Sequence, residues 1–258
     1  MNRTFQPSHP KGVDGGNGVF LTAEWRHLAM LNYEADPRLL ASFIPDGTEL
    51  DRWHGKVFIS LVGFRFLRAK LFGLLPIPMH SNFDEVNLRF YVRRQADNQT
   101  DTEVRRGVVF IREMVPRRAI AFVARTFYNE NYVALPMAHE IRSVGDHGLS
   151  VAYRWRGGKR WNEINLETAG NPELPAEGSE EQFITEHYWG YAARPGGGCV
   201  EYRVTHPSWS VWQSRQSAFE GDGEEFYGKE IAEVLRGKPQ SAFLAEGSAV
   251  TVMRGQRL

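Results

Sequence analysis

The sequence predicts a β-dominated α+β fold, in which an antiparallel sheet is accompanied by a few short helices. Runs of β-forming residues recur along the chain between polar or Gly- and Pro-containing connectors, which is typical of hairpins. Only three short segments carry helical signals. The 258 residues are a length that single β-rich domains reach, and no linker divides the chain convincingly.

The expected helices are short and are placed by their first residues. The first begins at Pro37 with Asp36 as N-cap, because proline suits the first helical position. The second covers residues 179–185 and starts with a capping-box pattern, and the third covers 224–236, where apolar residues recur at helical spacing. The expected strands cover residues 20–33, 56–67, 82–94, 105–114, 119–128, 148–155, 160–166, 200–205 and 248–253.

The strand expected over residues 200–205 alternates strictly between apolar and polar side chains. Val200 and its alternate neighbours form an apolar face, and the opposite face carries Glu201, Arg203 and Thr205. We expect this polar face to meet solvent.

Composition excludes several classes of function. Lys plus Arg equals Asp plus Glu at 31 each, so neither nucleic acid nor an anionic membrane is expected as a partner. Cys199 is the single cysteine, and we find neither a secretory leader nor a membrane-spanning run, so we expect a cytoplasmic protein. Residues 1–18 are expected to form a disordered tail ahead of one domain over residues 19–258. A homo-oligomer is compatible with this composition.

Several long sequence blocks resemble a known bacterial family. They are TAEWRHLAMLNYEADPRLL from Thr22, ISLVGFRF, PMHSNFDEVNLRFYVRR, RGVVFIREMVPRRAIAFVAR, FITEHYWGY and YRVTHPSW. From about Thr22 to the C-terminus, the chain resembles the YqjF-like family of uncharacterised proteins, a domain of unknown function. More distantly, it resembles the acetoacetate-decarboxylase-like superfamily. This resemblance implies a predominantly antiparallel β-barrel around a central pocket.

The resemblance implies a fold more firmly than an activity, because one fold hosts many functions. The decarboxylases of the superfamily form a Schiff base through a lysine of lowered pKa. The comparable segment here, residues 125–133, contains no lysine, and neither Lys56 nor Lys70 sits where the superfamily places its nucleophile. We therefore expect a pocket without Schiff-base chemistry.

Glu85 and His80 are the candidates for acid–base catalysis. Glu85 and Arg89 share one face of the expected strand over 82–94, and His80 ends the loop before it. A histidine that titrates near neutrality beside Glu85 can act as general base, and Arg89 can hold a substrate carboxylate with two hydrogen bonds. An ordinary ion pair between Glu85 and Arg89 is the more common arrangement on a strand.

Four further candidates for ligand binding lie in residues 125–133, the segment comparable with the one that carries the lysine in the decarboxylases. An arginine and two tyrosines can bind an anionic or planar ligand, although aromatics at a strand end more often belong to the core or its rim. The four residues are Arg125, Tyr128, Glu130 and Tyr132.

His187 and His206 complete the set of ligand-binding candidates. Their two blocks are expected to be adjacent, and with His80 and Glu85 they would offer ligands for zinc or iron. Their spacing matches no recognised metal motif, so we expect no metal. A metal-dependent enzyme that uses His80, His187 and His206 is kept as an alternative. No cofactor-binding motif is found, so no cofactor is expected.

These observations favour binding of a small organic, carboxylate-bearing ligand in the pocket. The accompanying chemistry is acid–base catalysis without a Schiff-base lysine. The alternative from a different class is a non-catalytic sensor or protein-interaction module, so an enzyme and a binding protein are both consistent with the sequence.

Overall fold

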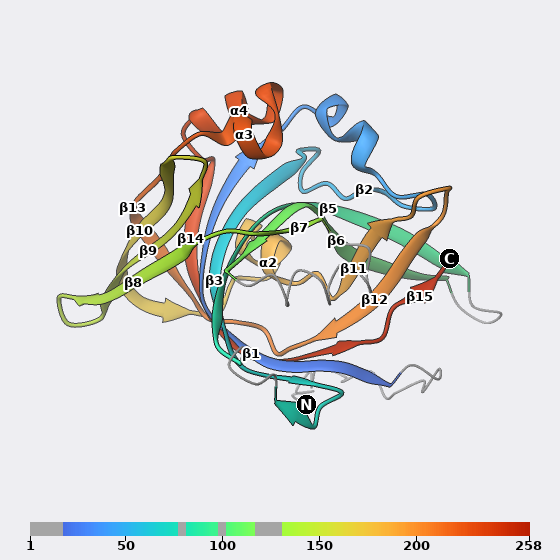
Figure 1. Ribbon diagram of the computed structural model, residues 1–258, viewed down its shortest axis with the longest axis horizontal. Helices are drawn as coiled ribbons and strands as arrows, with labels where there is room; N and C mark the ends of the chain where they lie inside the picture. The colour runs from blue at the N-terminus through green and yellow to red at the C-terminus, as the bar shows by residue number, and fades with distance from the viewer. Residues whose placement is uncertain (1–17, 77–80, 98–101, 117–130) are drawn as a thin grey trace, which may run out of the picture.

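The computed structural model describes residues 18–76, 81–97, 102–116 and 131–258. One strongly curved sheet holds most of these residues, and the helices are short (Figure 1). The predicted β-dominated and mainly antiparallel fold is confirmed. The elements are β1 (Val19–Glu34), η1 (Pro37–Phe43), β2 (Glu49–Leu50), β3 (Phe58–Leu71), β4 (Leu75–Pro76), β5 (Phe83–Asp97), β6 (Thr102–Val115), β7 (Tyr132–Ala134), β8 (Met137–Val144), β9 (Gly148–Gly157), β10 (Arg160–Glu173), α2 (Glu180–Thr185), β11 (Trp189–Ala193), β12 (Cys199–Thr205), β13 (Val211–Glu220), α3 (Gly223–Tyr227), α4 (Lys229–Arg236), β14 (Ser241–Met253) and β15 (Gln256–Arg257).

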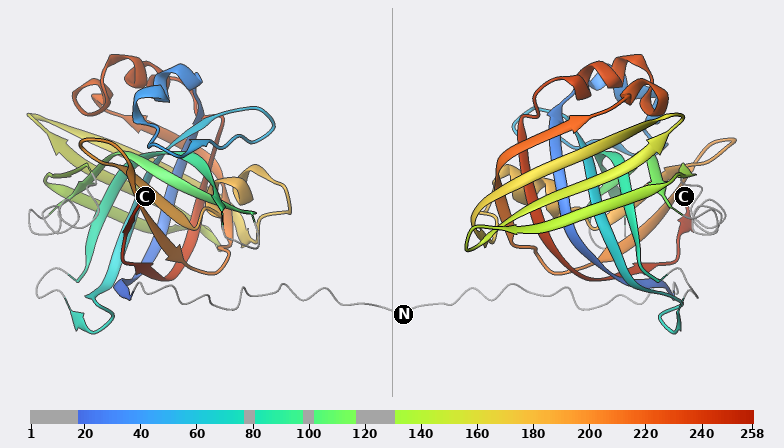
Figure 2. Two further views of the ribbon diagram at one scale, coloured as in Figure 1. Left: turned by 90° about the vertical axis from the view of Figure 1, so that its right-hand side faces the viewer. Right: turned by 60° about the vertical axis from the view of Figure 1, so that its left-hand side comes forward.

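Part of the sheet closes on itself. From β12 the hydrogen-bonded order runs through β11, β6, β5, β3, β1 and β14, and β14 pairs again with β12 where Val252 lies opposite Val204. Neighbours in this ring are antiparallel except β6 and β11, which run parallel. Helix α2 lies within the curve of the sheet, whereas η1, α3 and α4 gather at one end (Figures 1 and 2).

Strand β1 buries both of its faces over residues 28–31. Strands β13, β10, β9 and β8 continue the sheet beyond β14 and cross the outside of the ring (Figure 2). On β1, Ala29 and Leu31 belong to the core that includes this outer layer, whereas Leu28 and Met30 belong to the core on the inner side. Since both faces are covered, β1 is a continuous apolar run at these positions and does not alternate.

The three predicted helices are present, with two corrections. Asp36 caps the first as predicted, but η1 is a 3-10 helix. The Ser179 hydroxyl caps α2 by accepting a hydrogen bond from the backbone N–H of Gln182 at 3.2 Å. The segment expected as one helix over 224–236 is two helices, α3 and α4, because Gly228 between them has a φ of 79°, outside the helical region.

The predicted strands agree with the structure where it describes them. The strand expected over 119–128 and the expected tail, apart from Gly18, lie outside the described residues. The patterns did not predict β8, β11 or β13, nor the short strands β2, β4, β7 and β15. Both β8 and β13 carry polar side chains at half or more of their positions, so neither shows the apolar run that marks a buried strand.

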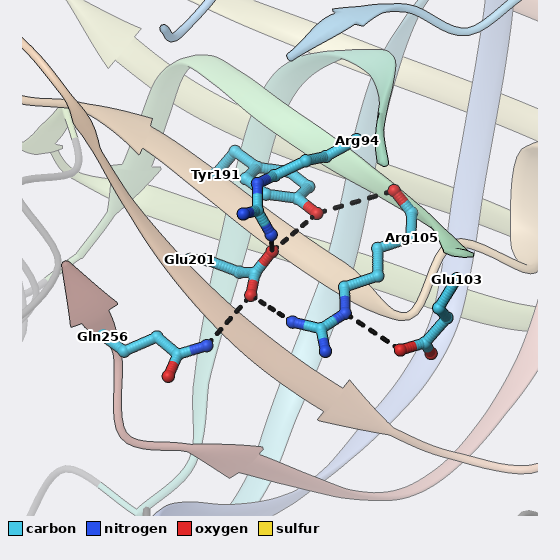
Figure 3. Close-up of polar contacts among 6 residues, drawn as sticks. All are labelled: Arg94, Glu103, Arg105, Tyr191, Glu201 and Gln256. Carbon is cyan, nitrogen blue, oxygen red and sulfur yellow. Dashed lines mark hydrogen bonds and ion pairs between the residues drawn. The ribbon is translucent and has the colours of Figure 1, made fainter. Parts of the chain in front are cut away.

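Strand β12 corrects the prediction of a solvent face. Glu201 was expected to meet water, but its exposed fraction is 0%. It accepts hydrogen bonds from Arg105 at 2.6 Å, Arg94 at 3.2 Å, the Tyr191 hydroxyl at 3.0 Å and Gln256 at 3.0 Å (Figure 3). The polar face of β12 therefore contains a buried charge network, which joins β5, β6, β11, β12 and β15.

Candidate functional site

A cavity of about 180 Å³ lies on the inner side of the ring of strands. Aromatic and aliphatic side chains form most of its wall. A group of polar side chains interrupts this wall and gives the cavity its chemistry. Within the described ranges, the polar members are Glu85, Asn87, Arg89, Glu113, Tyr132, Thr185, His187, Tyr202 and His206.

Strand β5 supplies three of these polar side chains. Glu85, Asn87 and Arg89 alternate with Val86 and Leu88, so the pleat of the strand turns all three to the cavity. Their exposed fractions are 2%, 2% and 8%. The polar face predicted for this strand is therefore a cavity wall and not a solvent face.

Glu85 is a buried carboxyl group that accepts two hydrogen bonds. The Asn87 side-chain amide donates to its Oε1 at 3.0 Å, and the Tyr132 hydroxyl donates to its Oε2 at 3.3 Å. Burial raises the pKa of Glu85 to about 7, although these hydrogen bonds and the charge of Arg89 act in the opposite direction. Such a group exchanges a proton near neutral pH, as acid–base chemistry requires.

The raised pKa of Glu85 predicts a stability that depends on pH. In the unfolded chain this carboxyl ionises near pH 4.5, whereas in the folded chain it ionises near pH 7. Its contribution to stability is therefore complete below pH 4.5 and is lost as the pH rises through 7. The Glu85→Gln variant cannot ionise at this position, so it does not lose this stability as the pH rises. From about pH 4 to about pH 8, we expect its free energy of unfolding to rise relative to wild type by on the order of 3 kcal/mol.

Urea unfolding at a series of pH values measures this difference for Glu85. Any effect of the substitution that is independent of pH cancels in the comparison. Glu103→Gln is the control, because the Glu103 side chain is 51% exposed and should give no such trend. A constant difference between Glu85→Gln and wild type across the range would contradict a pKa near 7.

Arg89 is a buried cation that has no carboxylate within ion-pair distance in the described part of the chain. Its guanidinium donates to the Ile184 carbonyl at 3.4 Å and contacts the Met30 sulfur at 3.9 Å. Its Nε has no hydrogen-bond partner among the residues that the structure describes. The ordinary Glu85–Arg89 ion pair considered from the sequence is therefore not formed. Since a buried charge without a counterion costs free energy, Arg89 is a candidate for binding an anion.

A buried carboxylate orients His187. The Nε2 atom of His187 lies 3.1 Å from Oδ2 of Asp51, and this oxygen also accepts from Nε of Arg106 at 2.7 Å. Burial alone would raise the pKa of Asp51, but the hydrogen bonds from His187 and Arg106 outweigh it and lower this pKa to about 2. Burial lowers the pKa of His187 to about 4.

At neutral pH this pair is an ionised Asp51 and a neutral His187. The ring proton is therefore on Nε2, which donates to the carboxylate, and Nδ1 is an acceptor. Nδ1 has no hydrogen-bond partner within the described ranges. His187 thus brings to the cavity an acceptor whose tautomer Asp51 sets.

His206 is a second neutral histidine at the cavity. Its Nδ1 donates to the Pro207 carbonyl at 2.8 Å, so its Nε2 is an acceptor. Its ring stacks on Trp209 with 4.0 Å between centroids. Burial lowers the pKa of His206 to about 4, and the nearby charge of Arg89 acts in the same direction.

The structure brings five of the residues predicted from the sequence to this one cavity. They are Glu85, Arg89, Tyr132, His187 and His206. The other candidates lie outside the described residues: His80, Arg125, Tyr128 and Glu130.

Sequence patterns did not predict two acidic residues of this region. Pairing of β6 with β5 skips one residue between Phe110 and Arg112, and this bulge places Glu113 on the same face as Phe110. Simple alternation would place Glu113 on the opposite face. Asp51 is 136 positions from His187 in the sequence, so only the fold brings the two together.

Three features are absent from the described part of the chain. None of its lysines contributes to the cavity wall. No three His, Cys, Asp or Glu side chains in it are grouped closely enough to hold a metal ion, and His80 lies outside this part of the chain. None of its helices combines the length and the apolar character needed to cross a membrane.

Comparison with known sequences identifies a family. The family model DUF2071, described as an uncharacterized conserved protein, matches residues 22–249. The uncharacterized protein YqjF of Bacillus subtilis is 26% identical over 141 residues, which are 54% of this chain and 54% of YqjF. The chain therefore matches about half the length of this relative.

Comparison with solved structures identifies the fold. The acetoacetate decarboxylase of Legionella pneumophila superposes with a TM-score of 0.65 at 12% identity, over 98% of this chain and 92% of that one. The enduracididine biosynthesis enzyme MppR, complexed with pyruvate, gives 0.59 at 13% identity over 97% and 95%. At these identities the likeness concerns the fold alone. The acetoacetate decarboxylase-like fold expected from the sequence is confirmed.

Proposed function

Since this chain belongs to DUF2071, a family of uncharacterized conserved proteins, and has an acetoacetate decarboxylase-like fold, we propose that its cavity binds a small organic acid. The observation that carries this proposal is Arg89, a buried cation at the cavity wall without a carboxylate partner in the described ranges. A carboxylate offers two coplanar oxygens that match the donors of a guanidinium. The complex of MppR with pyruvate, a small organic acid, in the same fold supports the proposal.

Glu85 supplies proton exchange beside this anion site. It lies on the same wall of β5 as Arg89, and its pKa of about 7 allows both protonation states at neutral pH. Protonated Glu85 can donate a hydrogen bond or a proton to the ligand, and ionised Glu85 can accept a proton. Nδ1 of His187 adds an acceptor for a ligand hydroxyl group. This acid–base chemistry requires no lysine.

The affinity for organic acids is expected to rise as the pH falls from about 8 to about 6. Ionised Glu85 repels a carboxylate held at Arg89, whereas protonated Glu85 does not. His187 and His206 do not titrate in this range, because the pKa of each is about 4. Isothermal titration calorimetry with pyruvate, acetoacetate and phenylacetate measures the trend.

Glu85→Gln is the matched variant for this titration, because glutamine is neutral at every pH and keeps the shape of the side chain. Its affinity should not vary with pH between about 6 and about 8. If the same pH trend persisted in Glu85→Gln, Glu85 would have no part in the site. If no acid bound to the wild-type protein at any pH, the proposed function would be wrong.

An enzyme and a non-catalytic sensor differ in the fate of the bound acid. Incubation of the protein with each acid that binds, followed by proton NMR over time, separates the two. Consumption of the acid by the wild-type protein but not by Glu85→Gln is the result expected of acid–base catalysis. An unchanged acid at full occupancy of the site would instead support the sensor.

A further inference from the structure

The apolar wall of the cavity is a continuous group of aromatic rings. The Trp25 ring lies 5.5 Å from that of Phe64, 5.8 Å from Phe66 and 6.2 Å from Trp209, all in edge-to-face contact. The Phe66 ring in turn stacks on Phe83 at 4.5 Å. All five rings line the cavity. Such a surface favours an apolar or aromatic group, which it can contact on ring faces and ring edges.

The aromatic wall and the polar wall meet, so one ligand can contact both. Glu85 on β5 lies directly opposite Phe64 on β3, and both face the cavity. His206 stacks on Trp209, while its pKa responds to the charge of Arg89. An acid whose carboxylate binds Arg89 can therefore extend through the same cavity towards these rings.

The cavity is larger than a two- or three-carbon acid requires. An engineered apolar cavity of about 150 Å³ accommodates benzene, and this one has a volume of about 180 Å³. One ring with a short carboxylate arm is of matching size. Acetate or pyruvate would leave most of the aromatic surface without an apolar partner, so the main source of affinity would be unused.

We propose that the ligand is a hydrophobic carboxylic acid with one ring, or a branched chain of equal size, whose carboxylate binds Arg89 and whose apolar part lies against Trp25, Phe64 and Trp209. This inference rests on the proposed function and adds the chemical class of the ligand. It distinguishes this cavity from one whose size and shape match short 2-oxo acids.

Three probe compounds test the inference on the wild-type protein by calorimetry. Phenylacetate has both groups, acetate has only the carboxylate, and 2-phenylethanol has the ring without the charge. Phenylacetate is expected to bind at least about 50-fold more tightly than acetate, because burial of each additional carbon adds to affinity. It is also expected to bind at least about tenfold more tightly than 2-phenylethanol, because only the acid pairs with the guanidinium.

A variant that fills the cavity adds a second test. Val108 lines the cavity from β6 and is 7% exposed, so Val108→Phe adds a ring inside the cavity and reduces the volume left for a large ligand. We expect phenylacetate to lose at least about tenfold in affinity and acetate to be unaffected. Circular dichroism and thermal unfolding show whether the variant is folded. If it is not folded, the three titrations of the wild-type protein decide whether the ligand is a hydrophobic acid.

The outcomes distinguish this inference from the proposed function. If acetate or pyruvate bound as tightly as phenylacetate, the hydrophobic class would be wrong and the organic-acid site would stand. If 2-phenylethanol bound as tightly as phenylacetate, the carboxylate would have no role and both would be wrong. Absence of binding by the three probe compounds and by pyruvate would also overturn both.

Discussion

Replacing Arg89 with methionine is expected to weaken the binding of organic acids by about 100-fold and at the same time to stabilise the ligand-free protein. The loss of affinity follows from two charge-assisted hydrogen bonds, which together are worth about 3 kcal/mol. The gain in stability follows from burial, since Arg89 is 8% exposed and no carboxylate pairs with it in the described residues. Methionine has a similar length and no charge, so we expect the free energy of unfolding to increase by about 1–4 kcal/mol.

Two other arginines serve as controls for Arg89. Arg106→Met should destabilise the protein, because Arg106 pairs with the buried Asp51 that orients His187. Arg215→Met should change neither property, because the Arg215 side chain is 74% exposed. Urea unfolding and calorimetry measure both quantities. If Arg89→Met were less stable than wild type and bound acids normally, Arg89 would be a structural residue and not the anion site.

Replacing Glu201 with glutamine is expected to lower the free energy of unfolding by about 3 kcal/mol. The substitution removes the charge that Arg94 and Arg105 share and leaves both guanidinium groups without it (Figure 3). Loss of one partner of a buried ion pair typically costs about 3–5 kcal/mol. We expect the lower end, because the Arg94 and Arg105 side chains are 22% and 15% exposed and water can partly replace the carboxylate.

Glu103→Gln is the matched control for Glu201. Glu103 also pairs with Arg105, at 3.1 Å, but its side chain is 51% exposed, so its loss should cost less than about 1 kcal/mol. Urea unfolding of the two variants gives the comparison. Phenylacetate binding should be unchanged in both, since neither residue lines the cavity. Equal losses of stability would show that burial does not increase the contribution of Glu201 to the free energy of unfolding.

Local patterns predicted the parts of the fold that depend on neighbouring residues. The alternation of β5 placed Glu85 and Arg89 on one face, and the structure shows that this face lines the cavity. Capping residues located the starts of η1 and α2. The break at Gly228 was harder to predict, because the apolar spacing on its two sides is continuous with one helix.

Features that depend on contacts between distant strands could not be predicted in this way. Nothing in the alternation of β12 indicates that arginines from β5 and β6 cover Glu201. The bulge that turns Glu113 to the cavity is a property of the pairing of β6 with β5. The contact of Asp51 with His187 joins a loop after β2 to the residues after α2, which only the closed ring brings together.

A crystal structure of the protein with phenylacetate would test the central claim most directly. We expect the carboxylate to accept two hydrogen bonds from Arg89 at about 2.7–2.9 Å, with the ring against Trp25 and Trp209. Glu85 should lie within hydrogen-bond reach of the ligand. A carboxylate bound away from Arg89, or a ligand outside this cavity, would contradict the claim that this chain binds organic acids through the buried guanidinium.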